Sequence, residues 1–94
     1  MRIEYVSPWA DIDPEDDNID VHVRLDDGRV YSLLVATPRS IYRCMESDGI
    51  SYFIATPPPV FVSRLTEASI ERAVEALVTE NGGRNLHIYG VLQI

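Results

Sequence analysis

Carboxylates are the residues in this chain whose type and spacing could do chemistry. Six of the ten residues from position 11 to position 20 are Asp or Glu, and two more acids follow at a turn. The candidate site is therefore Asp11, Asp13, Glu15, Asp16, Asp17, Asp20, Asp26 and Asp27. Concentrated carboxylates can hold a cation, bind a basic protein or keep a loop solvated.

A calcium loop is the first of these three possibilities. Asp11, Asp13 and Glu15 occupy the first, third and fifth positions of an EF-hand spacing, where oxygen ligands stand. However, Asp16 stands where the loop needs glycine, and His22 stands where it needs a bidentate carboxylate. We therefore predict no metal site. A solvated loop and a docking surface for a cationic protein stay open as alternatives.

Trp9 stands two positions before Asp11, the first residue of the acidic run. Its indole could cover an edge of the core. It could also anchor an interface, because tryptophan is enriched among the residues that dominate binding energy. We include Trp9 with the eight acids in the predicted partner-binding surface.

Nucleophilic catalysis has little support in the sequence. Cys44 is the single cysteine, which excludes an internal disulfide, and it stands beside Met45 on the apolar face of a predicted helix. His22 and His87 are the only histidines, and both fall in predicted strands with nothing local to pair them with Cys44. One Cys and two scattered His are too few for zinc. We predict no catalytic residue and no cofactor.

The net charge restricts the class of partner. The chain has 15 acidic residues against eight Arg and no Lys, which gives a net charge of −7. Nucleic acids and anionic membranes attract cationic surfaces, so we expect neither as a partner. Residues 1–48 carry eleven acids and five Arg, so most of the negative charge lies in this half. We expect a basic protein partner, because opposite charge accelerates association.

Length and composition indicate a single domain over residues 1–94. The 46% of hydrophobic and 24% of charged residues are close to the globular average. The N-terminal segment has no apolar stretch typical of a signal peptide, and no apolar run approaches the roughly 20 residues of a membrane span. With only one cysteine, we expect a cytoplasmic protein, either a monomer or a homodimer.

Local patterns predict an α+β domain of order β-β-β-α-β-β-α-β. The predicted strands cover residues 2–7, 19–25, 30–36, 50–55, 60–62 and 86–94. One helix should begin after Thr37 and end at Gly49, and the other should begin after Thr66 and end at residues 81–83. We expect a mostly antiparallel sheet with both helices packed on one face. The second helix could join two parallel strands through a right-handed crossover.

The turn at residues 26–28 leaves the register of a hairpin open. A two-residue turn would put apolar residues 21, 23 and 25 on the same face as residues 30 and 34. A three-residue turn, with Gly28 in a bulge, would match them with residues 31, 33 and 35 instead. We prefer the second register, which makes the second strand apolar on both faces and places it inside the sheet.

Four segments also carry a resemblance to a known family. They are DNIDVHVRLDDGRVYS at residues 17–32, Ala36-Thr-Pro, Ile41-x-x-Cys-Met45, and VFVSRLTE at residues 60–67. With these turn and cap signals, the chain resembles small bacterial immunity proteins of contact-dependent or polymorphic toxin systems. The resemblance implies an inhibitor that covers the cationic surface of a toxin, such as a nuclease, and it carries over no catalytic residue. Trp9 or Tyr5 would then supply part of a desolvated centre.

Overall fold

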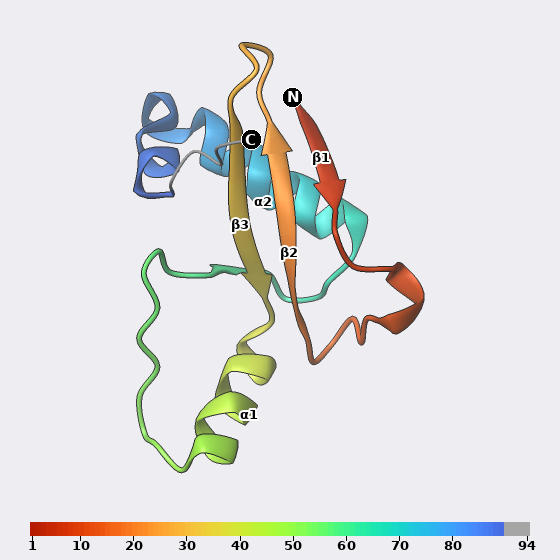
Figure 1. Ribbon diagram of the computed structural model, residues 1–94, viewed down its shortest axis with the longest axis vertical. Coiled ribbons are helices and arrows are strands. Elements are labelled where there is room, and N and C mark those ends of the chain that lie inside the picture. The colour runs from red at the N-terminus through yellow and green to blue at the C-terminus, as the bar shows by residue number, and fades with distance from the viewer. Residues whose placement is uncertain (90–94) are drawn as a thin grey trace.

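The sheet has four strands in the order β1-β2-β3-β4 (Figure 1). The computed structural model describes residues 1–89. The strands are β1 (Arg2–Tyr5), β2 (Asn18–Arg24), β3 (Val30–Ala36) and β4 (Val60–Phe61). The helices are α1 (Pro38–Asp48) and α2 (Glu67–Thr79), with 3-10 helices η1 (Trp9–Asp11) and η2 (Glu80–Ile88). β1, β2 and β3 are antiparallel and β4 is parallel to β3, so the predicted α+β class is confirmed and the sheet is mixed.

The hairpin of β2 and β3 has the register of the three-residue turn. Val23 pairs with Tyr31, and the pairs on either side follow the same register. Gly28 closes the turn with a φ of 91°, a backbone conformation that is strained for any residue with a Cβ atom. The preferred register is confirmed. It sets Val21 and Val23 of β2 with Tyr31, Leu33 and Val35 of β3 on the face that α2 covers.

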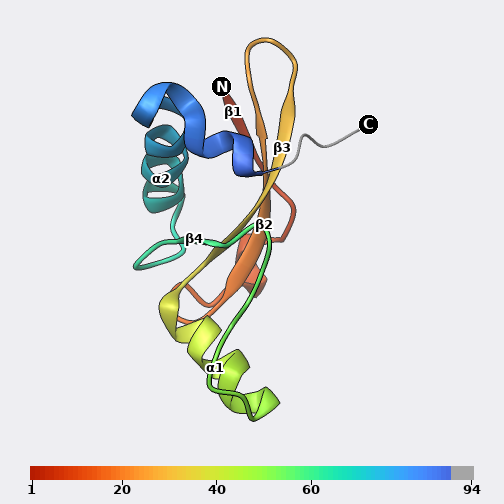
Figure 2. The same cartoon turned by 90° about the vertical axis from the view of Figure 1, so that its left-hand side faces the viewer.

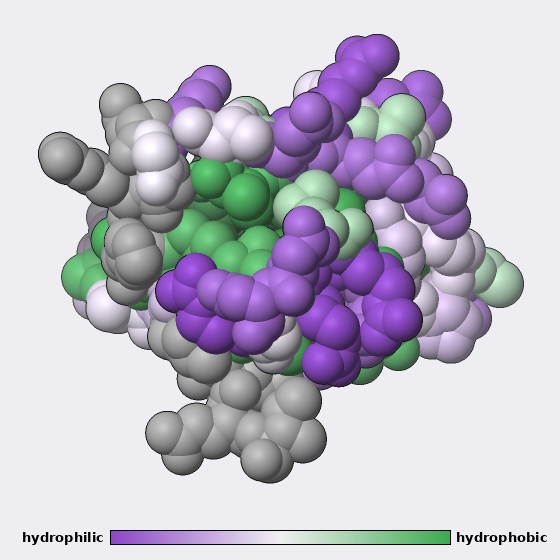
Figure 3. All heavy atoms as spheres, turned by 90° about the horizontal axis from the view of Figure 1, so that it is seen from above, coloured by the Kyte–Doolittle hydropathy of each residue, from purple (hydrophilic) through white to green (hydrophobic). Residues whose placement is uncertain are grey.

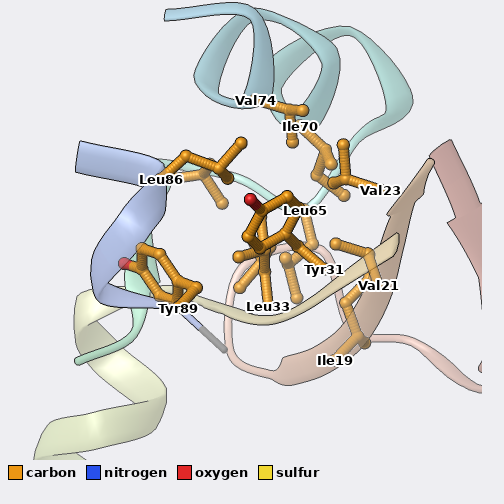
Figure 4. Packing of buried hydrophobic residues seen from close by; sticks show 12 residues of the cluster. Ile19, Val21, Val23, Tyr31, Leu33, Leu65, Ile70, Val74, Leu86 and Tyr89 are labelled. Atoms are coloured by element: carbon orange, nitrogen blue, oxygen red, sulfur yellow. The ribbon is translucent and has the colours of Figure 1, made fainter. Parts of the chain in front are cut away.

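The core lies between this face of the sheet and α2 (Figure 2). Ile70 and Val74 on α2 point toward the side chains of β2 and β3 (Figure 4). Leu65, the residue before the N-cap Thr66, is buried in the same cluster as Ile70, which fits the hydrophobic staple expected from their spacing. The buried cluster is Ile19, Val21, Val23, Tyr31, Leu33, Val35, Val62, Leu65, Ile70, Val74, Leu86 and Tyr89.

Three prolines explain why β4 has only two residues. Val60 pairs with Val35, and the same register continued backward would set Pro59 opposite Leu34. Proline has no N–H to donate to a ladder, so Pro57–Pro59 end the pairing and the chain leaves the sheet. The prediction of a strand at residues 50–55 is therefore wrong, and these residues form an irregular segment between α1 and β4.

The chain after α2 also departs from the prediction. α2 ends at Thr79 and η2 follows, so residues 86–88 are helical rather than part of a final strand. Gly82 has a φ of 65°, and the chain turns so that Leu86 and Tyr89 are buried in the core. Residues 90–94 of the predicted strand lie outside the described residues.

α1 lies beyond the end of the sheet and not on its face (Figures 1 and 2). β3 ends at Ala36 and α1 begins at Pro38, so only the N-cap Thr37 connects them. A one-residue connection is too short to bring the helix back across the sheet. The prediction that both helices cover one face is therefore wrong. The parallel pair is joined by α1 and the segment after it, and not by α2.

Candidate functional site

Six of the eight predicted acids gather where β2 begins, at the same end of the molecule as α1 (Figure 1). We call this group the acidic end. It consists of Asp11, Asp13, Glu15, Asp16, Asp17 and Asp20. The first five stand on the connection between β1 and β2, and the sixth stands on β2 itself.

Hydrogen bonds hold the connection in one shape. The amide of Glu15 donates to Oδ1 of Asp13 (3.0 Å), and the amide of Asp13 donates to Oδ2 of Asp17 (3.2 Å). The amide of Leu65 donates to the carbonyl of Pro14 (2.7 Å), which ties the connection to the residues before α2. Part of the carboxylate set therefore shapes the loop, as Asp side chains do in turns.

Ion pairs divide the acidic end into paired and free carboxylates. Nε of Arg43 on α1 lies 3.0 Å from Oδ1 of Asp16, and Nη1 of Arg64 lies 3.9 Å from Oε1 of Glu15. Asp11, Asp13 and Asp20 are exposed and form no ion pair with a described side chain. These three carboxylates are free to meet a cation from outside.

The other two predicted acids lie at the opposite end of the hairpin. β2 has seven residues, so its ends are about 20 Å apart at roughly 3.3 Å per residue. Asp26 is bound by the N-terminal ammonium group at 2.7 Å, and Asp27 by Nε of Arg29 at 2.7 Å. The pKa of Asp27 is lowered, mainly because the backbone amide of Arg29 donates a hydrogen bond to its carboxylate. The eight acids therefore do not form one face.

The hairpin end carries charges of both signs. Seen along the long axis, hydrophilic side chains surround an apolar centre at this end (Figure 3). A shallow pocket of about 220 Å³ there is lined by Met1, Arg2, Arg24, Leu25 and Asp26. Both acids of this end are in ion pairs, whereas three carboxylates of the acidic end have no ion pair with a described side chain, so this end is less suited to a cationic partner.

Trp9 is partly used by the core. Its ring lies 5.0 Å from the ring of Tyr5, with an angle of 54° between their planes, and both rings pack against the buried cluster. Trp9 is nevertheless half-exposed and belongs to the same 3-10 turn as Asp11. It therefore covers the edge of the core and presents a remaining apolar surface beside the acidic end.

The hydroxyl oxygen of Tyr5 is buried and has no hydrogen-bond partner among the described residues. In this part of the chain it is the one buried polar side-chain atom in this condition. Burial raises the pKa of Tyr5, and the charges of Glu71 and Glu67 on α2 raise it further. The Tyr5 hydroxyl is thus held in its neutral form close to two carboxylates. The hydroxyl oxygen is buried, so it does not reach the surface.

Cys44, the candidate nucleophile, does not share a pocket with a described histidine. Cys44 is half-buried on α1 next to a shallow pocket of about 230 Å³, whose lining includes Arg43 and Asp48 but no described histidine. The side chain of His87 lies outside the described part of the structure. Among the described residues, no three His, Cys, Asp or Glu side chains are grouped as metal ligands. No helix formed by residues 1–89 has the length and apolar character needed to cross a bilayer.

A further surface was not expected from the sequence. α1 and the segment after it, residues 37–59, contribute no side chain to the described core cluster; we call this part the arm. The arm exposes Tyr42, Ile50, Tyr52, Phe53 and Ile54. The signal in the sequence is the stretch from residue 49 to residue 63, which has no charged residue and contains three consecutive prolines.

These features define a small α+β domain with a mixed four-stranded sheet, an acidic end and an apolar arm. No protein-family model matches the chain, and neither the curated proteins nor the solved structures contain a match.

Proposed function

We propose that this protein binds a basic protein partner through the acidic end and neutralises it by covering its cationic surface. The observation that carries this proposal is three exposed carboxylates that form no ion pair with a described side chain: Asp11 and Asp13 on a connection held by hydrogen bonds, and Asp20 on β2. A surface that is already ordered loses little conformational entropy on binding.

The cationic partner follows from the chemistry of the surface. A nuclease needs a positive active site to hold phosphate, so an acidic protein can compete for the same surface. This is the action of an immunity protein, which is the class that the sequence resembles. Each exposed charge pair contributes only about 0–1 kcal/mol, so charge would set the rate and orientation of association more than its strength.

The apolar contact would come from Trp9. Its exposed part lies on η1 beside Asp11, and tryptophan is enriched among binding hot spots. Tyr5 packs behind Trp9 and would support the indole without touching the partner. Asp26 and Asp27 have no part in this proposal, because they lie at the other end of the hairpin and are already paired.

A capture experiment with matched variants tests the proposal. Wild-type protein, an acidic-end variant (Asp11→Asn, Asp13→Asn, Asp20→Asn) and a hairpin control (Asp26→Asn, Asp27→Asn) are immobilised, and proteins captured from extracts of the source cells are compared by mass spectrometry. We expect the wild type and the control to retain the same basic protein and the acidic-end variant to lose it. Raising the salt from about 0.05 M to about 0.3 M should release the partner, because screening shortens the reach of exposed charges.

Two results would contradict the proposal. The first is a partner that the acidic-end variant and the wild type retain equally. The second is a partner whose activity is unchanged at equimolar complex, because neutralisation requires that binding abolish activity. A homodimeric module is the second candidate function, and the arm is the observation that favours it.

A further inference from the structure

The segment that follows α1 combines an absence of charge with exposed apolar side chains. Residues 49–63 contain no Asp, Glu, Lys or Arg, although the whole chain carries −7. Tyr52, Phe53 and Ile54 are exposed in this segment, with Ile54 at 82%. Apolar side chains gathered on one exposed surface are typical of an interaction site.

The main chain in the middle of this segment also lacks main-chain partners among the described residues. The amide of Ile50 donates to the carbonyl of Met45 at the end of α1 (3.0 Å). From residue 51 to residue 58, no main-chain group forms a hydrogen bond with the main chain of another described residue. Unpaired N–H and C=O groups are readily satisfied by a strand from another chain.

The sequence of the segment favours a strand. Residues 50–55 read Ile-Ser-Tyr-Phe-Ile-Ala, in which β-branched and aromatic residues dominate. Pro57–Pro59 prevent these residues from extending β4 along β3. The segment therefore has the composition of a strand, and its own sheet offers it no partner through β4.

We propose that residues 50–55 pair with the same residues of a second copy of this chain, so that the protein is a homodimer joined through the arm. In an antiparallel pair about a two-fold axis, N–H groups of each copy donate to C=O groups of the other at alternate residues, and symmetry makes every such bond occur twice. Two chains of net charge −7 repel each other, and an uncharged segment is where they meet with the least repulsion. A basic partner, by contrast, is drawn to the acidic end.

The exposed area is sufficient for a weak but specific dimer. Aromatic and large aliphatic side chains offer about 200 Å² each when fully accessible, so the exposed fractions of six side chains amount to roughly 600 Å² per copy. These side chains are Tyr42, Ile50, Tyr52, Phe53, Ile54 and Phe61. Two copies would bury at most about 1,200 Å², when all six side chains are fully covered, which is the lower end of the range for specific interfaces.

The dimer does not depend on the proposed function. None of the six residues of the acidic end belongs to the segment from residue 50 to residue 55. Loss of the basic partner and loss of the dimer are therefore measured with different variants. Either result leaves the other proposal standing.

Sedimentation velocity over about a hundredfold range of protein concentration tests the dimer. We expect the wild type to approach twice the chain mass of 10.6 kDa as concentration rises. Ile54→Glu should raise the dissociation constant at least about tenfold, because it replaces the most exposed apolar side chain of the pairing segment with a charge in each copy. Ile88→Glu is the matched control, since Ile88 is 57% exposed on η2 outside the arm, and it should leave the dimer unchanged.

Hydrogen exchange then tests the strand pairing itself. Alternate amides within residues 51–55 should be protected in the wild-type dimer, because only every second amide points at the partner strand, and these amides should exchange freely in Ile54→Glu. A wild type that stays monomeric at every concentration would overturn the proposal and assign the arm to a different protein. A dimer that Ile54→Glu leaves intact, or one whose residues 51–55 exchange freely, would overturn it as well.

Discussion

The hydroxyl oxygen of Thr37 lies 3.3 Å from the amide nitrogen of Asp17, twenty residues earlier in the chain. The same oxygen accepts from the amide of Ser40 at 3.3 Å, as an N-cap does, and the amide of Thr37 donates to the carbonyl of Asp17 at 3.1 Å. One buried side chain therefore joins the start of α1 to the acidic end.

Thr37→Val should destabilise the protein by about 1–3 kcal/mol. Valine keeps the shape of the side chain but removes the cap and leaves the Asp17 amide without its acceptor. Urea unfolding followed by circular dichroism measures the loss. Thr37→Ser should recover most of it, and Thr79→Val, on an exposed hydroxyl at the end of α2, should change stability by no more than about 0.5 kcal/mol. Equal effects at positions 37 and 79 would contradict the joint role of Thr37.

Neighbouring leucines on β3 test which face of the sheet is the core. Leu33 is 1% exposed in the core cluster, whereas Leu34 points to the other face and is half-buried. Leu33→Ala should cost about 2–5 kcal/mol in the free energy of unfolding, and Leu34→Ala less than half as much. Urea titrations of both variants make the comparison. A larger loss at Leu34 would mean that the hairpin register is wrong.

Tyr5→Phe should stabilise the protein at neutral pH by about 1 kcal/mol, because it removes a buried hydroxyl that has no hydrogen-bond partner among the described residues. Burial raises the pKa of Tyr5 above its ordinary value of 10.0, so the folded state resists the deprotonation that the unfolded state undergoes. Stability should therefore fall as the pH rises above 10.0, and less so in Tyr5→Phe. Tyr52→Phe, at an exposed site, is the control and should change neither quantity.

Glu4 should contribute to the acid sensitivity of the sheet. Hydrogen bonds first from Arg2 and then from Arg24 hold the pKa of Glu4 below its ordinary value of 4.5. The folded state thus favours the carboxylate form of Glu4. The stability that this carboxylate contributes is present above pH 4.5 and is lost as the pH falls through the lower pKa of the folded state. The difference in urea midpoint between wild type and Glu4→Gln should shrink over that window. Glu75→Gln, on the exposed face of α2, should give no such pH-dependent difference.

The sequence by itself determined the elements whose signals are local. Alternating apolar residues and the turn at Gly28 specify the hairpin, because the side chains of a strand alternate between its faces. They left two registers open, and the structure confirms the preferred one, with Gly28 at positive φ. Thr37 and Thr66 specify the starts of α1 and α2, because their hydroxyls satisfy amides within the first turn. The apolar stripe of α2 likewise identifies the face that enters the core.

Only the tertiary structure decided where these elements lie. Eight acids that are close in sequence are divided between the two ends of β2, since a strand carries its termini far apart. Residues 50–55 have the composition of a strand but pair with no other strand of the described sheet. Pairing needs the edge of a neighbouring strand, and Pro57–Pro59 prevent this segment from continuing β4 along β3. The propensity of a segment for helix or strand depends on its own residues. Whether that segment pairs with a strand, is covered by a helix or stays exposed depends on which other parts of the chain lie against it.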